Sequence, residues 1–346
     1  MKLLTVIAMA ILSMFSTQGK TTEILYVQNT FSGDITLIEI PSHEVIGRIE
    51  VGKYPDDVVA SPDGKVVYVN RINSAGLERA PNAGDSGEVI AISPITDQIL
   101  WRVPVDGMPN HMTVTRDSRF LFVPFYNSLW VAVIDTEKHA VVDKIGVGHG
   151  SHGTRLSPDG KRLYVGSMMN DMISIIDVET RKVVKRIPFD DGVRPFDITR
   201  DEKWMYVQRS RLHGFDVVDL AAGKVVKTVK LPALAEGTKL PEFYPHTVNH
   251  GLALSRDGKL LFAAGSIANY VCVYSVPDLK LLATIPVGRD PNWIVFSSDG
   301  KFAYVTNRGS NDLSVISVSD LKEVKRVKVG NYPQRLQVLN VSGRRV

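Results

Sequence analysis

The stretch Asp56-Asp-Val-Val-Ala-Ser-Pro-Asp-Gly-Lys-Val-Val-Tyr-Val-Asn70 contains the pattern that decides the fold. An apolar segment leads into Ser61-Pro-Asp-Gly64, where Asp and Gly favour a tight turn, and a second alternating segment follows. The same order returns along the chain, and in each copy one polar residue stands five positions before the turn or its equivalent. These seven residues are Asp56, Asn110, His152, Arg194, His250, Asn292 and Gln334.

The spacing of these seven residues defines a repeat. Four of the six intervals are 42 residues, and the other two are 54 and 56 residues because they contain insertions of 12 and 14 residues. Each unit holds four short segments with the two-residue alternation of β-strands, separated by turn residues. Self-similarity at this period is typical of a β-propeller. We therefore predict an all-β, seven-bladed propeller with four antiparallel strands per blade.

The two ends of the repeat array complement each other. Residues Ile24 to Asn29 have the pattern of the second strand of a blade, whereas Gln334 to Leu339 have that of an innermost strand. Three N-terminal strands and one C-terminal strand should therefore complete a shared blade, which closes the ring and removes its free sheet edge. Residues 20–346 are expected to form this single domain.

Composition restricts the setting in which the protein works. Lys2, an apolar run over residues 3–15 and small or polar residues up to Gly19 predict a signal peptide over residues 1–19, and hence a secreted or periplasmic protein. No later stretch is apolar enough for stable membrane insertion. The formal net charge is +4 and no basic run occurs, so nucleic acid is not an expected partner. We expect a monomer that binds a small molecule.

The segments Tyr304-Val-Thr-Asn307 and Ile285-Pro-Val-Gly288, together with the repeated Ser-Pro-Asp-Gly turn, resemble the YVTN-repeat family of seven-bladed propellers. This family includes YncE-like and cytochrome d1-like propellers, and the resemblance covers essentially the whole mature chain. It implies the fold but not one function, because similar scaffolds occur in haem d1 domains, quinoprotein pathways, a streptogramin lyase and sugar-lactone hydrolases.

A candidate site lies where the repeat places its polar residues. In a propeller the strand that carries the turn is the innermost of its blade, so the seven residues should ring one mouth of the central channel. The insertions, at about residues 73–87 and 232–249, lengthen loops on that same face and should wall a pocket. The predicted ligand-binding residues are Asp56, Asn110, His111, Arg194, His246, Asn292, Trp293, Gln334 and Arg335.

Histidines are concentrated at this mouth. His152 and His250 are candidate general acids or bases, because imidazole titrates near neutral pH. A divalent metal is a candidate cofactor, with ligands drawn from His111, His152, His246 and His250. Their spacing matches no established metal signature, and His-Glu-x-x-His is absent. His111 stands one position out of register, which predicts a different direction for its side chain.

Each of these residues also has a structural interpretation. Polar groups at a channel mouth can hydrogen-bond strand ends. Arg194 and Arg335 suit either a carboxylate or phosphate ligand or an ion pair with Asp56, Asp57 or Asp197. Trp293 suits either stacking on a planar ligand or packing.

The favoured function is an exported propeller that binds a small polar or anionic molecule at the channel mouth. One alternative is a metal-assisted or histidine-dependent lyase or hydrolase that uses the same residues, so whether the protein is an enzyme stays open. A second alternative, a carrier associated with haem d1 or a quinone cofactor, is implied only by the family resemblance.

Overall fold

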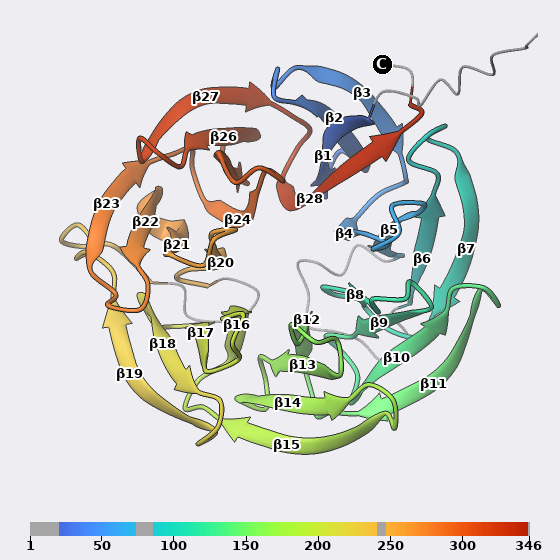
Figure 1. The fold of residues 1–346 in the computed structure, drawn as a ribbon, viewed down its shortest axis with the longest axis horizontal. Coiled ribbons are helices and arrows are strands. Elements are labelled where there is room, and N and C mark those ends of the chain that lie inside the picture. Colours follow the sequence, from blue (N-terminus) through green and yellow to red (C-terminus); the bar gives the residue numbers. More distant parts are fainter. Residues whose placement is uncertain (1–20, 74–85, 241–246, 345–346) are drawn as a thin grey trace, which may run out of the picture.

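The computed structural model describes residues 21–73, 86–240 and 247–344. Seven four-stranded antiparallel sheets are arranged around a central axis, as Figure 1 shows, so over these residues the predicted seven-bladed propeller is confirmed. Within each sheet the four strands lie side by side in order from the channel outward. No helix in these three ranges is both long and apolar enough to cross a membrane.

The strands follow the repeat in chain order. Blade 1 contains β28 (Pro333–Ser342), β1 (Thr21–Asn29), β2 (Asp34–Ile40) and β3 (Val45–Glu50). Blade 2 contains β4 (Pro55–Ala60), β5 (Val67–Ile72), β6 (Gly87–Ile92) and β7 (Ile99–Val105). Blade 3 contains β8 (Thr113–Val114), β9 (Phe120–Pro124), β10 (Trp130–Asp135) and β11 (Ala140–Gly146). Blade 4 contains β12 (Ser151–Leu156), β13 (Arg162–Ser167), β14 (Met172–Asp177) and β15 (Lys182–Pro188).

The remaining blades repeat this order. Blade 5 contains β16 (Val193–Ile198), β17 (Trp204–Arg209), β18 (Gly214–Asp219) and β19 (Lys224–Lys230). Blade 6 contains β20 (Leu252–Leu254), β21 (Leu260–Gly265), β22 (Tyr270–Ser275) and β23 (Leu281–Pro286), with a short 3-10 helix, η2 (Ser266–Ala268), between β21 and β22. Blade 7 contains β24 (Pro291–Phe296), β25 (Phe302–Asn307), β26 (Asp312–Ser317) and β27 (Lys322–Lys328).

Blade 1 closes the ring in the way the sequence predicts. The last strand, β28, pairs antiparallel with β1, and Tyr26 lies opposite Gln337 in this ladder. In Figure 1 the red strand β28 lies beside the blue strands of the N-terminal part. The inner strand of the ring at this point is therefore supplied by the end of the chain.

Side-chain hydrogen bonds hold the repeated turn between the first two strands of a blade. The Ser61 hydroxyl donates to Asp63 at 2.6 Å and accepts the backbone N–H of Val66 at 3.0 Å. Gly64 adopts φ = +73°, which glycine reaches without strain. The pair Ser297 and Asp299 repeats the same hydroxyl-to-carboxylate bond in blade 7. The Ser-Pro-Asp-Gly pattern thus fixes the direction in which the chain leaves the channel.

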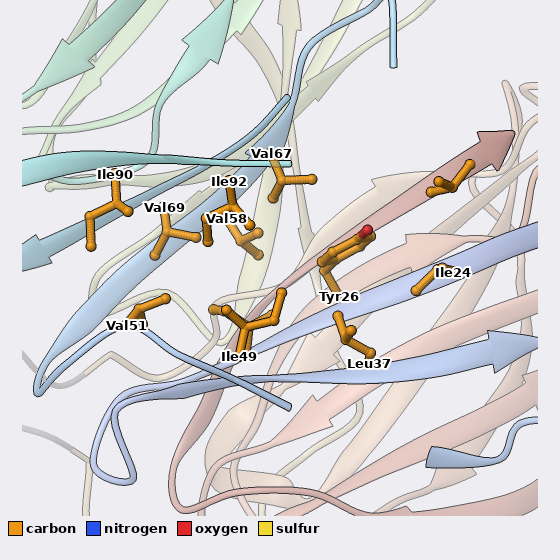
Figure 2. Packing of buried hydrophobic residues seen from close by; sticks show 12 residues of the cluster. Ile24, Tyr26, Leu37, Ile49, Val51, Val58, Val67, Val69, Ile90 and Ile92 are labelled. Carbon is orange, nitrogen blue, oxygen red and sulfur yellow. The ribbon is translucent and has the colours of Figure 1, made fainter. Parts of the chain in front are cut away.

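The hydrophobic core lies between adjacent blades. Figure 2 shows Tyr26 and Leu37 of blade 1 packed against Val58, Val69 and Ile90 of blade 2, and all five are buried. Because each strand alternates, one face of every sheet meets the preceding blade and the other meets the following blade. This packing holds the inner strands rigidly around the channel.

Candidate functional site

Two sets of loops meet on one face of the ring, which we call the loop face. One set leads into the inner strands and the other joins the second and third strands of each blade. Backbone hydrogen bonds connect the two sets of loops. The N–H of Arg308 donates to the Asp290 carbonyl at 3.0 Å, and the N–H of Tyr126 donates to the Met108 carbonyl at 3.0 Å. The opposite face, which carries the Ser-Pro-Asp-Gly turns, is called the turn face. Inner strands begin at the loop face and run toward the turn face.

The seven repeat-register residues lie at the loop-face ends of the inner strands. Six of them are buried, and Gln334 is half-buried. Asp56, His152, Arg194, Asn292 and Gln334 belong to β4, β12, β16, β24 and β28. Asn110 and His250 precede the short inner strands β8 and β20. The sequence therefore locates these residues correctly within their blades, although they are covered rather than open to solvent.

His111 is brought into the centre of the site by an irregular inner strand, contrary to the direction expected from its register. Its backbone N–H donates to the His152 carbonyl at 3.2 Å, and its backbone bridges in parallel to Gly153 of the next blade. Since β8 begins only at Thr113, the chain before it follows the neighbouring blade. The ring of His111 lies 4.1 Å from that of His152 and 5.7 Å from that of His250, between centroids.

The three histidines form a compact cluster, which we call the histidine cluster. One ring nitrogen of each, from blades 3, 4 and 6, can be chosen so that all three lie within 4.8 Å of one another. Burial lowers the pKa of each ring well below 6.5, and the positive charge of Arg194 lowers the pKa of His152 further. The rings are therefore neutral at physiological pH and present lone pairs.

Several nitrogens of this cluster have no hydrogen-bond partner among the residues that the structure describes. They are both ring nitrogens of His111 and Nδ1 of His152. A buried polar atom without a partner costs about 1–3 kcal/mol. By contrast, Nδ1 of His250 lies 3.1 Å from the Asn292 backbone carbonyl, an acceptor, so this nitrogen carries the proton of the neutral ring. Nε2 of His250 is then the lone-pair nitrogen.

Arg335 and Trp293 lie against the histidine cluster. The guanidinium carbon of Arg335 is 3.3 Å from the centre of the Trp293 ring, and this ring is 5.2 Å from His111 and 5.8 Å from His250. Arg335 also donates from Nε to Asp57, so it forms the ion pair that the structural interpretation anticipated. Its Nη1 has no partner within the described ranges. The indole and guanidinium therefore stack as a cation–π pair.

Asp56 lies beside this ion pair, and its carboxyl is buried. Gln334 donates to its Oδ1 at 3.0 Å, while its Oδ2 has no partner in the described chain. Burial, reinforced by the negative charge of Asp57, raises the pKa of Asp56 to about 7. Near neutral pH this carboxyl is thus divided between its protonated and ionised forms.

Arg194 and Asn292 are held by side chains of neighbouring loops. Arg194 donates from Nε to the Ser210 hydroxyl at 2.8 Å and from Nη1 to the Met168 sulfur at 2.9 Å. The Asn292 amide is oriented with its oxygen 3.2 Å from Nη1 of Arg308 and its nitrogen 3.1 Å from the Gln334 carbonyl. Both residues therefore contribute to the architecture of the loop face.

A cavity of about 380 Å³ occupies the channel next to His111, Trp293 and Arg335. Its other polar residues are Thr113, Thr154, Arg155 and Gln337, and the rest of its wall includes Val59, Phe196 and Val295. Each lining residue follows one of the seven repeat-register residues by one to four positions. Because the inner strands run from the loop face toward the turn face, the cavity extends from the histidine cluster toward the turn face. None of the residues that line it is an Asp or Glu.

Arg155 and Gln337 are site residues that the sequence analysis missed. Both stand three positions after the register residue of their blade, and inner-strand side chains alternate, so they point into the channel. Arg155 lies 3.2 Å from Asp197. The same repeat would have identified them, if the position three residues after each register residue had been compared between blades. His246 lies outside the described residues, as do most of the first insertion (residues 74–85) and residues 241–246 of the second.

The fold and the channel site define a class of protein: a seven-bladed propeller whose polar residues converge on the channel axis. A family model described as YNCE-like beta-propeller matches residues 63–243. The chain belongs to this family.

Individual relatives are more distant. A 6-phosphogluconolactonase of Enterobacter sp. (strain 638) is 25% identical over 142 residues, which are 40% of this chain and 38% of that relative. The structure of the periplasmic gluconolactonase PpgL of Pseudomonas aeruginosa has a TM-score of 0.72 at 20% identity, over 92% of this chain and 99% of the other. The dihydro-heme d1 dehydrogenase NirN, solved in complex with DHE, has a TM-score of 0.63 at 16% identity, over 88% and 63%. Because PpgL and NirN are only 20% and 16% identical to this chain, their likeness shows a shared fold alone.

Proposed function

We propose that this protein is an exported propeller that binds a small organic anion, of the size of a sugar acid, in the channel cavity. The observation that carries the proposal is that Arg335 and His111 both line the cavity and both retain nitrogens without a partner in the described chain. The guanidinium N–H of Arg335 and the single N–H of the neutral His111 ring are a preorganised site, because a ligand can supply the missing acceptors.

The charge and shape of the cavity support an anion. Two guanidinium groups, those of Arg155 and Arg335, line it, and none of its lining residues is a carboxylate. Guanidinium groups bind carboxylates and phosphates through paired N–H donors. Trp293 adds a flat apolar surface for the body of the ligand. A volume of about 380 Å³ is at the lower end of ligand pockets, which favours a compact molecule over a macrocycle such as haem d1.

Turnover of a lactone at the same place is the second candidate function. Its support is the position of His152 and His250 against His111, which lines the cavity, because a neutral imidazole can act as the general base that activates water. The resemblance of the chain to a 6-phosphogluconolactonase and to a periplasmic gluconolactonase agrees with this chemistry. The periplasmic location in the name of the second protein also agrees with export, which the apolar segment at residues 3–15 predicts.

Isothermal titration with gluconate, glucose and inorganic phosphate tests the binding proposal. We expect gluconate to bind and neutral glucose not to bind. Arg155→Gln should weaken gluconate binding by about 10-fold or more, the cost of a lost charged hydrogen bond. Arg181→Gln is the matched control, because Arg181 also forms a half-buried ion pair, with Asp143, but does not line the channel cavity. Failure of both anions to bind at millimolar concentration would refute the proposal.

Two further measurements separate the alternatives. Acid release from glucono-δ-lactone, followed in a pH-stat, distinguishes turnover from binding, and His152→Gln should abolish it if this ring is the base. The intact mass of protein recovered from the periplasm of an expression host tests export: removal of residues 1–19 is expected, and an unprocessed cytoplasmic product would contradict it.

A further inference from the structure

We infer that His111, His152 and His250 form a three-histidine site for a divalent transition-metal ion of the zinc class, with a fourth position open to an exogenous ligand. The inference shares His111 with the anion site proposed above, but it rests on the mutual approach of three imidazole rings, so metal binding can be tested without the anion. Their three blades, 3, 4 and 6, approach the channel axis from different directions. Three imidazoles thus converge without any being adjacent in sequence.

The distances suit a single ion. One nitrogen of each ring lies within 4.8 Å of the other two. Nitrogens bound to one tetrahedral Zn²⁺ are about 3.3 Å apart, since each Zn–N bond is 2.0–2.1 Å. Small rotations of the rings toward their common centre close this difference. The cluster is therefore within side-chain motion of a metal-bound geometry.

The hydrogen bonds leave the lone pairs available for metal. His111 has no partner for either nitrogen and His152 has none for Nδ1, within the described part of the chain, and the two side chains are nearly fully buried. His250 donates from Nδ1 to the Asn292 carbonyl, so its Nε2 is the unprotonated nitrogen. A backbone carbonyl that accepts the second N–H of a histidine is the usual way in which proteins orient a metal ligand.

The donor set selects the class of ion. Neutral imidazole nitrogens suit Zn²⁺, Cu²⁺, Ni²⁺ and Fe²⁺, whereas Ca²⁺ and Mg²⁺ require oxygen ligands. The group contains no carboxylate or thiolate among the described residues. Three protein ligands without a fourth are the arrangement of open zinc sites, in which water or a substrate atom completes the coordination.

The surrounding charges select the fourth ligand. Arg335 and Arg194 lie close enough to His152 for their positive charge to act on it, and the Trp293 ring contacts the ring of His111 edge-on and that of His250 at a tilt. Positive charge opposes a bare dication but favours a dication that carries an anion. We therefore assign the open position to hydroxide or to the carboxylate of a small organic acid.

Titration of metal-stripped protein with Co²⁺ and Zn²⁺ tests the inference. We expect one ion per chain, visible d–d absorption of Co²⁺ with the intensity of a four- or five-coordinate site, displacement by Zn²⁺ and a higher melting temperature with metal. His111→Ala and His152→Ala should each weaken binding at least about 100-fold, more than the loss of an outer-shell partner. His139→Ala, a change to an exposed histidine outside the cluster, should bind as the parent does.

Each outcome decides the inference. Absence of stoichiometric binding by the parent protein would overturn it, as would unchanged affinity in folded His111→Ala and His152→Ala. If an alanine variant does not fold, His152→Gln, which keeps a neutral polar side chain, replaces it and should still lose the ion. Gluconate added to the Co²⁺ protein tests the fourth position separately. If Co²⁺ binds and gluconate leaves its spectrum unchanged, the metal site stands. The organic anion is then not its fourth ligand.

Discussion

Nε of Arg335 lies 2.6 Å from Oδ1 of Asp57, and both side chains are buried. The ion pair joins β28 of blade 1 to β4 of blade 2. Asp57 also accepts the backbone N–H of Met112, which precedes the inner strand of blade 3. One carboxylate therefore connects three consecutive blades where the chain closes on itself, directly beside the channel cavity.

Removing one partner of this pair should destabilise the protein strongly. Arg335→Met leaves the Asp57 carboxylate buried without its counter-charge, and we expect a loss of about 3–5 kcal/mol in the free energy of unfolding. Urea unfolding followed by intrinsic fluorescence measures it. Lys325→Met, which breaks an exposed pair with Glu44, should leave the midpoint nearly unchanged. Equal effects of the two substitutions would contradict the structural role of the buried pair.

Asp56 predicts a pH dependence of stability. Its pKa in the folded protein is about 7, against an ordinary value of 3.8. Between these values the folded protein binds a proton that the unfolded chain has released, so this group makes the fold less stable as the pH rises toward 7. Asp56→Asn should flatten the decline between pH 4 and 8 and be more stable than the parent at pH 8, by about 1–4 kcal/mol.

Unfolding free energies of the two proteins at pH 4, 6 and 8 provide the measurement. Asp57, Arg335 and Arg308, which act on Asp56 through their charges, are present in both, so the difference between the two curves isolates this carboxyl. Parallel curves would show that Asp56 titrates normally.

The packing between blades predicts the effect of core truncation. Leu37 is fully buried between blades 1 and 2, whereas Val184 on the outer strand β15 is 60% exposed. Leu37→Ala should cost about 2–5 kcal/mol through lost burial and a residual cavity. Val184→Ala should change stability by no more than about 0.5 kcal/mol. Thermal unfolding of the two variants makes the comparison, and similar melting temperatures would contradict the assignment of Leu37 to the core.

Two glycines in strands should respond to alanine in opposite directions. A Cβ at Gly214 would lie 2.2 Å from the Val229 carbonyl oxygen, whereas one at Gly146 would meet nothing within 4 Å. Gly214→Ala therefore forces β18 away from β19 and should destabilise the blade by about 1–3 kcal/mol. Gly146→Ala should be neutral or stabilising by up to about 1 kcal/mol, because alanine restricts the unfolded chain. Melting temperatures that move together would contradict this contrast.

The repeat made the fold predictable, but only part of the site. Because the turn after each inner strand recurs every 42 residues, apart from the two insertions, the blades, their closure by β28 and the positions of His152 and His250 follow from the sequence. The approach of His111 to these two does not follow, since it depends on β8 starting only at Thr113 and on a bridge to Gly153. From the sequence, the ion-pair partner of Arg335 could be limited only to Asp56, Asp57 or Asp197. The choice among them depends on how neighbouring inner strands pack.

The pairing of β28 with β1 also determines when the ring can be completed during synthesis. The strands of blade 1 that leave the ribosome first have no inner neighbour until residues Pro333–Ser342 have been made. Blades 2–7 can assemble in order, but the closed channel, and with it the pair of Arg335 with Asp57, forms only after residues Pro333–Ser342 have been made. A nascent chain that has not reached these residues therefore remains an open arc, and β28 closes it by pairing with β1.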